Sequence, residues 1–153
     1  MQMDGSAHNK KRIRILLCNF DERFNEYVQG LYLGFVDLSP NEKNYDVIAI
    51  GEKGCPFMSV KVNGDVVFCP HEKPLPNQIS CESLIDCGMN EKCSLTFSSV
   101  GDENAMLCIN RDILYKGKRI EQSEKNFTLI PKLTLYDNIV LGGIASIYKN
   151  YLQ

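Results

Sequence analysis

The chain has 153 residues, of which 44% are hydrophobic and 24% are charged, a composition typical of one soluble globular domain. The net charge of −2, and the lack of any stretch that is both basic and aromatic, argue against nucleic-acid binding. No apolar run approaches the roughly 20 residues of a membrane span, and the first residues lack the apolar core of a secretory signal.

Seven cysteines are many for this length, and several lie inside apolar runs such as Leu16-Leu17-Cys18 and Leu107-Cys108-Ile109. In such runs cysteine behaves as a small core hydrophobe. Because the count is odd and no secretory signal is seen, we expect reduced thiols in an intracellular, reducing compartment rather than a disulfide framework.

The first predicted elements are a strand and a helix. Residues 1–11 are polar and predict a disordered tail, so we expect the domain to span residues 12–153. The apolar run over 12–18 predicts a strand. Residues 21–35 carry apolar side chains at spacings of three and four, with carboxylates in the first turn, and therefore predict a helix.

The stretch NYDVIAIGEKGCPF, residues 44–57, contains a β-branched run that ends at Gly51. Such a run, cut off by glycine, is typical of a strand buried on both faces of a parallel sheet. Pro56 fits the start of a short helix. Residues 60–68 fit either two short strands around an Asn63-Gly64 turn, or a loop followed by one parallel strand at Val66.

The second half of the chain predicts strands and helices in alternation. The expected elements are an extended connection over 71–77, a helix over 79–89 with Ser80 as N-cap, a segment over 91–99 of undecided type, a strand over 105–109, a turn at 116–118, a strand over 127–130 and a helix over 133–152. Gly142-Gly143 weakens the last helix by roughly 1 kcal/mol per glycine. The alternation predicts an α/β fold, a single Rossmann-like domain with a mainly parallel sheet and helices on both faces.

Known site motifs do not fit this chain. Residues 19–23 contain no glycine, so neither a dinucleotide fingerprint nor a P-loop follows the first strand, and we expect no cofactor. The four residues Cys69, His71, Cys81 and Cys87 can be drawn as a metal site. Their spacing is not that of a zinc ribbon or finger, and we interpret them as buried cysteines beside a loop histidine, with no metal.

Catalysis by a nucleophile requires a nearby base, and the only histidines are His8, in the expected tail, and His71. Cys55 would have a lowered pKa if a helix began at Pro56. A small cytosolic thiol-dependent α/β enzyme that uses Cys55, or a Cys81/Cys87 pair, is therefore an alternative. We expect no catalytic residue and no activity of the chain on its own.

Taken together, several stretches resemble the globular α/β domain of the gamma subunit of F-type ATP synthase. They are IRILLC, the following helix with Tyr27, YDVIAIGEKGCPF with its Gly-x-x-Gly-x-x-Phe exit, the loop at Leu75-Pro76-Asn77-Gln78 before the helix at Ser80, AMLCIN, and LTLYDNIVLGGIASIYKNYL. The similarity is colinear over roughly residues 12–152. It departs where the family carries a glycine-containing turn and this chain has Glu22-Arg23-Phe24-Asn25.

The resemblance implies a non-catalytic subunit or interaction domain at the foot of the central stalk. Its partners would be protein subunits of an ATP synthase, and it would be peripheral to an energy-coupling membrane through them. About eleven residues precede the first strand and the chain stops at Gln153, so we expect either a fragment or a relative without the coiled-coil shaft. An unrelated stand-alone interaction module is the other alternative.

A partner interface is expected at the carboxyl ends of the parallel strands, where ligands of α/β sheets bind. The residues that fall there are Phe20, Asp21, Arg23, Glu52 and Lys53.

Overall fold

The computed structural model describes residues 13–31, 35–55 and 58–152, and for 150–152 it describes the backbone only. The tail expected over 1–11 and the helix expected at Pro56 lie outside these residues. The elements are β1 (Arg14–Cys18), α2 (Glu22–Leu31), β2 (Phe35–Asp37), β3 (Asn44–Ile50), β4 (Val62–Pro70), β5 (Ile79–Cys87), β6 (Leu95–Val100), β7 (Asn104–Ile109), β8 (Ile113–Tyr115), β9 (Lys118–Ile120), β10 (Ser123–Thr128) and α3 (Leu135–Leu152).

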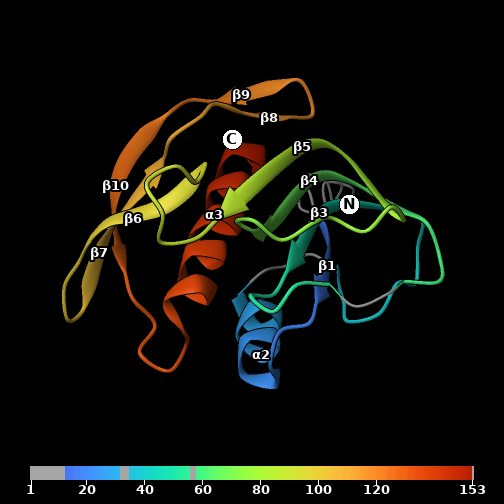
Figure 1. Cartoon of the computed structure of the whole chain (residues 1–153), viewed down its shortest axis with the longest axis horizontal. Helices are drawn as coiled ribbons and strands as arrows, with labels where there is room; N and C mark the ends of the chain where they lie inside the picture. Colours follow the sequence, from blue (N-terminus) through green and yellow to red (C-terminus); the bar gives the residue numbers. More distant parts are fainter. Residues whose placement is uncertain (1–12, 32–34, 56–57, 153) are drawn as a thin grey trace, which may run out of the picture.

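Eight strands form one sheet in the order β10-β7-β6-β5-β4-β3-β1-β2, while β8 and β9 form a separate hairpin (Figure 1). Neighbours are parallel from β2 to β6, and β7 and β10 add two antiparallel pairs at one edge. The expected α/β class with a mainly parallel sheet is therefore confirmed. Neither described helix is long and apolar enough to cross a membrane.

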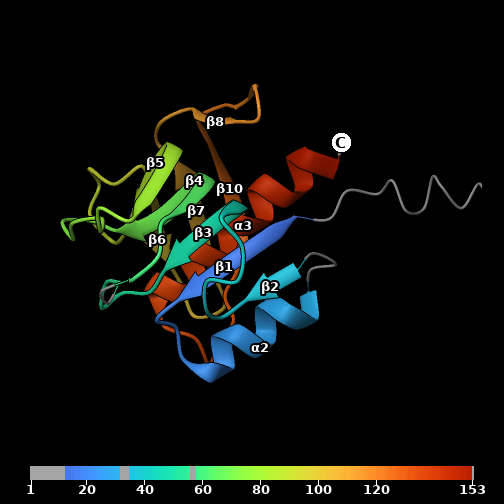
Figure 2. The same ribbon diagram turned by 90° about the vertical axis from the view of Figure 1, so that its right-hand side faces the viewer.

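The described part of the chain has two helices, and both contribute to the same hydrophobic cluster. Phe24 and Val28 of α2 and Ile144 and Ile147 of α3 belong to a core that includes Phe68 of β4. The opposite face of the sheet carries a second cluster, to which the connections contribute Met58 and Leu75. An arrangement with helices on both faces is therefore not confirmed. Figure 2 shows α2 beside β2 at the edge of the sheet.

The last helix lies close against several strands because it carries two glycines. A Cβ on Gly143 would lie 2.6 Å from side-chain carbons of both Phe68 and Leu95, and one on Gly142 would lie 2.8 Å from Leu107. These three side chains belong to β4, β6 and β7, so α3 crosses the middle of the sheet (Figure 1). The glycine pair therefore makes room for close packing, in addition to its cost in helix propensity.

The prediction of a helix over 79–89 is wrong, because Ile79–Cys87 form strand β5. The odd-numbered residues Ile79, Ile85 and Cys87 of this strand are buried. In contrast, Leu84 and Met89 are both 51% exposed. The helical spacing thus rested in part on two side chains that face solvent. In β5 every second side chain points inward, and some of these inner positions hold small residues.

The prediction of a turn at Asn63-Gly64 is also wrong. The alternative, a loop followed by one parallel strand, is closer to the structure. Gly64 lies inside β4, between Tyr45 of β3 and Cys81 of β5. Its missing side chain leaves room for Ile48, whose carbons would lie 2.9 Å from a Cβ. The undecided segment 91–99 ends in strand β6, and the turn at 116–118 joins β8 to β9 with positive φ angles at Lys116 and Gly117.

Candidate functional site

The strand order reverses at β1, whose neighbours are β2 on one side and β3 on the other. In open α/β sheets, ligands bind outside the carboxyl ends of the strands at such a reversal. Here the chain leaving β1 and the chain leaving β3 are held together: Gly51 N donates to Cys18 O at 2.8 Å, and Asn19 Nδ2 donates to Gly54 O at 2.8 Å. A Cβ on Gly51 would lie 2.0 Å from Asn19 O, so only glycine fits at this contact.

A hollow of about 280 Å³ opens at this point of the sheet. It is lined by Asn19, Phe20, Asp21, Glu52, Lys53, Thr134 and Asp137. The structure thus brings together four of the five residues expected at the interface, and their role as an interface stays a prediction. We name this hollow the rim hollow.

The fifth residue, Arg23, lies beside the rim hollow rather than in it. It lines an adjoining surface depression with Asp21, Glu22 and Glu26, and its guanidinium lies 3.4 Å from the carbonyl oxygen of Lys132. Arg23 is exposed. Its side chain therefore reaches toward the turn before α3 instead of the carboxyl end of β3.

Two helices begin at the rim hollow, and side chains of the chain itself cap both of them. Asp21 Oδ1 accepts a 2.9 Å hydrogen bond from the backbone of Phe24, and Thr134 Oγ1 accepts a 3.0 Å bond from the backbone of Asp137. Capping satisfies N–H groups that would otherwise attract an anion. With Asp21, Glu52 and Asp137 against the single cation of Lys53, the rim hollow favours a cationic group.

Asp137 has the most perturbed carboxyl group of this hollow. Burial and then the neighbouring Asp21 carboxylate raise its pKa from 3.8 to about 6, against a hydrogen bond from Thr134. The residue is 7% exposed. A cation that enters the hollow would therefore stabilise the ionised form of this carboxyl group.

A second hollow, of about 340 Å³, lies on the other side of Asn19. Cys18 and Cys55 both line it, together with Met58 and Val60. A hydrogen bond from the Cys18 thiol lowers the pKa of Cys55 although burial raises it, and the same bond raises the pKa of Cys18. Sequence reasoning missed this second thiol near Cys55, because the two lie far apart along the chain and only the pairing of β1 with β3 joins them.

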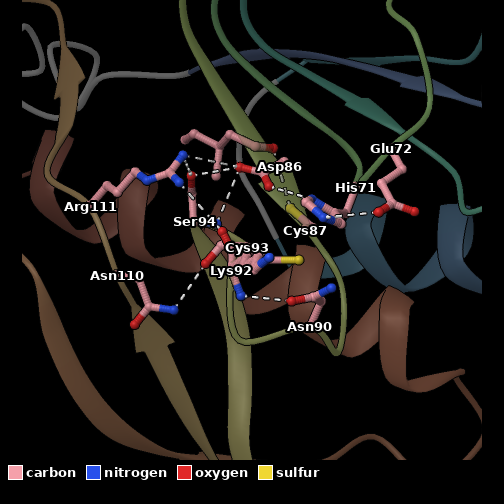
Figure 3. Close-up of polar contacts among 11 residues, drawn as sticks. His71, Glu72, Asp86, Cys87, Asn90, Lys92, Cys93, Ser94, Asn110 and Arg111 are labelled. Atoms are coloured by element: carbon pink, nitrogen blue, oxygen red, sulfur yellow. Dashed lines mark hydrogen bonds and ion pairs between the residues drawn. The ribbon is translucent and has the colours of Figure 1, made fainter.

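A polar network lies further along the same edge of the sheet, at the ends of β4 and β5 (Figure 3). His71 directly follows β4, and its Nδ1 lies 2.7 Å from Oδ2 of Asp86 in β5. The other carboxylate oxygen of Asp86 accepts hydrogen bonds from the hydroxyl and backbone N–H of Ser94, at 2.7 and 3.2 Å. Burial opposes the charge of Asp86, but these bonds outweigh it and hold its pKa below the usual value.

Cys93 lies beside this network in the loop before β6. Its residue is 0% exposed, and burial is the main cause that raises its pKa. Cysteine, histidine and aspartate are the residue types of a thiol hydrolase. The Cys93 sulfur is covered by protein in this structure, so a substrate as large as an acyl group does not reach it.

Of the four residues that the sequence offered as a metal set, the structure places His71 beside Asp86 and Cys93 instead of beside Cys81. The structure has all seven cysteines as free thiols. Asp86 was missed because the segment that carries it was expected to be a helix, and Cys93 was missed because it lies in the segment 91–99, whose type was undecided. Asp137 and Thr134 were missed because they come from the start of the last helix, far along the chain from Glu52 and Lys53.

No protein-family model, no curated protein and no solved structure matches this chain.

Proposed function

We propose that this chain is a non-catalytic domain that binds other protein subunits through the rim hollow. The observation that carries this proposal is the gathering of Phe20, Asp21, Glu52 and Lys53, with Asp137, at one concave site where the strand order reverses. Residues from three separate parts of the chain form that site. Such a site is a common position for ligand recognition in α/β folds.

The charge of the rim hollow indicates which partner surface it accepts. Three carboxylates face one lysine, and the raised pKa of Asp137 reflects burial together with their mutual repulsion. A lysine or arginine side chain that enters the hollow relieves this repulsion. The partner is therefore a protein surface that presents a basic side chain.

The particular form of the proposal is a subunit that resembles the gamma-subunit foot of F-type ATP synthase, held beside an energy-coupling membrane by its partners. Three of the stretches that carry the resemblance form β1, β3 and β7, and the last forms a helix. The stretch at Ser80 gives no support, because it is a strand here. The proposal therefore rests on the other segments and on the rim.

The experiment is affinity capture of the tagged chain from its native source, with mass spectrometry of stoichiometric partners. We expect ATP synthase subunits in the wild-type capture. We expect their loss in the variant Glu52→Lys, which reverses an exposed charge of the rim. Glu121→Lys is the matched control, because Glu121 is exposed but lies outside the rim, between β9 and β10.

The outcomes separate the general proposal from its particular form. Stoichiometric partners other than ATP synthase subunits, lost in Glu52→Lys and kept in Glu121→Lys, support the interface and overturn the rotor assignment. Partners that both variants retain overturn the interface at the rim hollow.

A thiol-dependent function is the second candidate, and the pairing of Cys55 with Cys18 favours it. Cys55 is half-buried at the second hollow, and a hydrogen bond from Cys18 stabilises its thiolate. Limited alkylation of the native chain, followed by peptide mapping, tests this candidate. It predicts labelling of Cys55 before Cys81, which is exposed to a similar degree, and slower labelling of Cys55 in Cys18→Ala. Equal labelling of Cys55 and Cys81 removes it.

A further inference from the structure

The cluster at the ends of β4 and β5 offers three different kinds of metal ligand. One ligand atom each from His71, Asp86 and Cys93 can be chosen so that all three atoms lie within 4.8 Å of one another. Figure 3 shows the imidazole and the carboxylate pointing toward each other, with Cys93 below them. A Cβ on Gly88 would lie 3.3 Å from Cys93 Sγ and 3.6 Å from Cβ of His71, so this glycine lets the two side chains approach.

We propose that His71, Asp86 and Cys93 bind a divalent ion of the zinc class. Imidazole nitrogen, thiolate sulfur and carboxylate oxygen are the three ligand types that Zn²⁺ takes in proteins. Hard ions such as Mg²⁺ and Ca²⁺ prefer oxygen alone, so sulfur in the set selects against them. This inference is independent of the interface at the rim hollow.

The surroundings of the cluster already hold each ligand in place. Ser94 binds one oxygen of Asp86 through its hydroxyl and its backbone N–H, so the other oxygen faces His71. Nδ1 is therefore the imidazole nitrogen assigned to the metal. Nε2 points away from Asp86 and lies 3.7 Å from the carboxylate of the exposed Glu72, a distance longer than a hydrogen bond. Hydrogen bonds such as those of Ser94 to Asp86 are the kind that orient metal ligands.

The loop that carries Cys93 is held from two sides. Cys93 N donates to Asn90 O at 2.9 Å, and Asn110 Nδ2 donates to Cys93 O at 2.9 Å. The backbone of His71 donates to Cys87 O at 2.9 Å, which ties the histidine to the end of β5. The three ligands therefore come from one well-tied part of the molecule, although they lie on three separate segments of the chain.

Metal binding requires a small rearrangement and the release of protons. Ligand atoms around a tetrahedral zinc are separated by about 3–4 Å, since the bonds are about 2.0–2.3 Å long. Nδ1 of His71 and Oδ2 of Asp86 must move apart slightly, and the sulfur must move in. The Cys93 thiol loses its proton to solvent, and the imidazole keeps one proton at Nε2. Arg111, 3.8 Å from Asp86, is 67% exposed and can swing away from the incoming charge.

The experiment titrates the full chain with Co²⁺, which reports thiolate ligation by a charge-transfer band, and then competes Zn²⁺ against it. We expect one ion per chain, and EXAFS of the bound metal with a single sulfur in its first shell. Zinc at about 100 times its Kd should raise the melting temperature by roughly 5–10 °C.

Four variants assign the ligands. Cys93→Ser and His71→Ala should each weaken binding at least roughly 100-fold, and Asp86→Asn at least about 10-fold. Cys108→Ser is the matched control, because Cys108 is also a buried cysteine next to a carboxylate, with Sγ 3.5 Å from Glu124 Oε2. It should bind like the wild type.

Several results overturn the proposal. One is a wild-type chain that takes up no stoichiometric Co²⁺ or Zn²⁺. Another is an EXAFS shell with two or more sulfurs, which would place the ion among other cysteines such as Cys69 and Cys87. His71 is partly exposed in a connection, so His71→Ala is expected to fold. A folded His71→Ala chain, by circular dichroism, that binds like the wild type also overturns it.

Discussion

The hydroxyl of Tyr136, in the first turn of α3, donates a 2.6 Å hydrogen bond to the carbonyl oxygen of Ile50, the last residue of β3. This bond joins residues 86 positions apart and fixes the start of the last helix over the carboxyl end of the parallel strands. It therefore also places Asp137 and Thr134 at the rim hollow. The position of the candidate site depends on this contact between a helix and a strand end.

Replacing Tyr136 by phenylalanine tests the contact. The hydroxyl is buried, so Tyr136→Phe leaves the carbonyl of Ile50 without this partner, and we expect a loss of about 1–2 kcal/mol in the free energy of unfolding. Urea denaturation measures the loss. Tyr27→Phe is the control, because the Tyr27 hydroxyl makes no hydrogen bond within the part of the chain that the structure describes. An equal effect of both variants would contradict the role of Tyr136.

Glycines in the two helices should respond to alanine with opposite signs. Gly30, in α2, has no atom within 4 Å of the position that a Cβ would take, so Gly30→Ala should raise stability by roughly 0.5–1 kcal/mol. Gly143→Ala should lower it by roughly 1–3 kcal/mol, because its Cβ would meet Phe68 and Leu95 at 2.6 Å. Thermal and urea unfolding of both variants measure the two signs. A stabilising Gly143→Ala would show that the sheet moves aside at little cost.

The stability of the chain should depend on Asp137 in mildly acidic solution. Its folded pKa of about 6 lies above the ordinary value of 3.8, so between these pH values the folded chain keeps a proton that the unfolded chain has lost. This carboxyl therefore contributes stability below about pH 4, and the contribution is lost as the pH rises to about 6. Asp137→Asn should remove this dependence and be more stable at pH 7, by on the order of 2 kcal/mol.

Unfolding curves between pH 3.5 and pH 7.5, roughly the range of the titration, measure the difference between the two chains. Asp102→Asn, in the exposed turn between β6 and β7, is the control for loss of one negative charge. If the wild type and Asp137→Asn have parallel pH profiles, the carboxyl is not held in its protonated form by the fold.

The β8–β9 hairpin is attached to the sheet by a lysine in an unusual backbone conformation. Lys116 has a φ of 51° and its Nζ lies 2.5 Å from Asp46 Oδ1 and 3.7 Å from Asp65 Oδ2. Burial raises the pKa of Asp65, and Lys116 opposes that rise. Lys116→Met should therefore cost about 1 kcal/mol at low ionic strength, and less in high salt.

Salt-dependent urea denaturation measures the loss. Lys118→Met is the matched control in the same hairpin, since Lys118 is exposed and forms no ion pair among the residues that the structure describes. A loss that is the same for both lysines, or that does not change with salt, would contradict an electrostatic attachment.

The sequence predicts those elements in which hydrophobic spacing and burial agree. The apolar runs of β1, β3 and β7 face neighbours on both sides. Helix α2 buries Phe24 and Val28 on its inner face, so in these elements one pattern describes both the local and the packed structure. β5 fails because Leu84 and Met89 are apolar but exposed. A single sequence does not state which apolar residues are covered, and tertiary packing decides that question.

Of the two candidate sites, the sequence predicts the rim hollow but not the cluster at the ends of β4 and β5. The carboxyl-end rule places Phe20, Glu52 and Lys53 together, because it requires only the order and direction of two strands. The cluster of His71, Asp86 and Cys93 requires the register of β4 with β5, in which Cys69 pairs with Asp86. A segment expected to be a helix has no such register. The error at β5 therefore concealed the cluster.

The two faces of the sheet should also differ in how readily they open in the native state. One face is closed by α2 and α3, whereas Met58 and Leu75 in connections help to cover the other, which carries Cys18 and Cys69. Short connections detach in local fluctuations that leave a packed helix in place. Solvent and small reagents should thus enter this protein from one side, and the sulfur atoms beneath the connections become accessible without global unfolding.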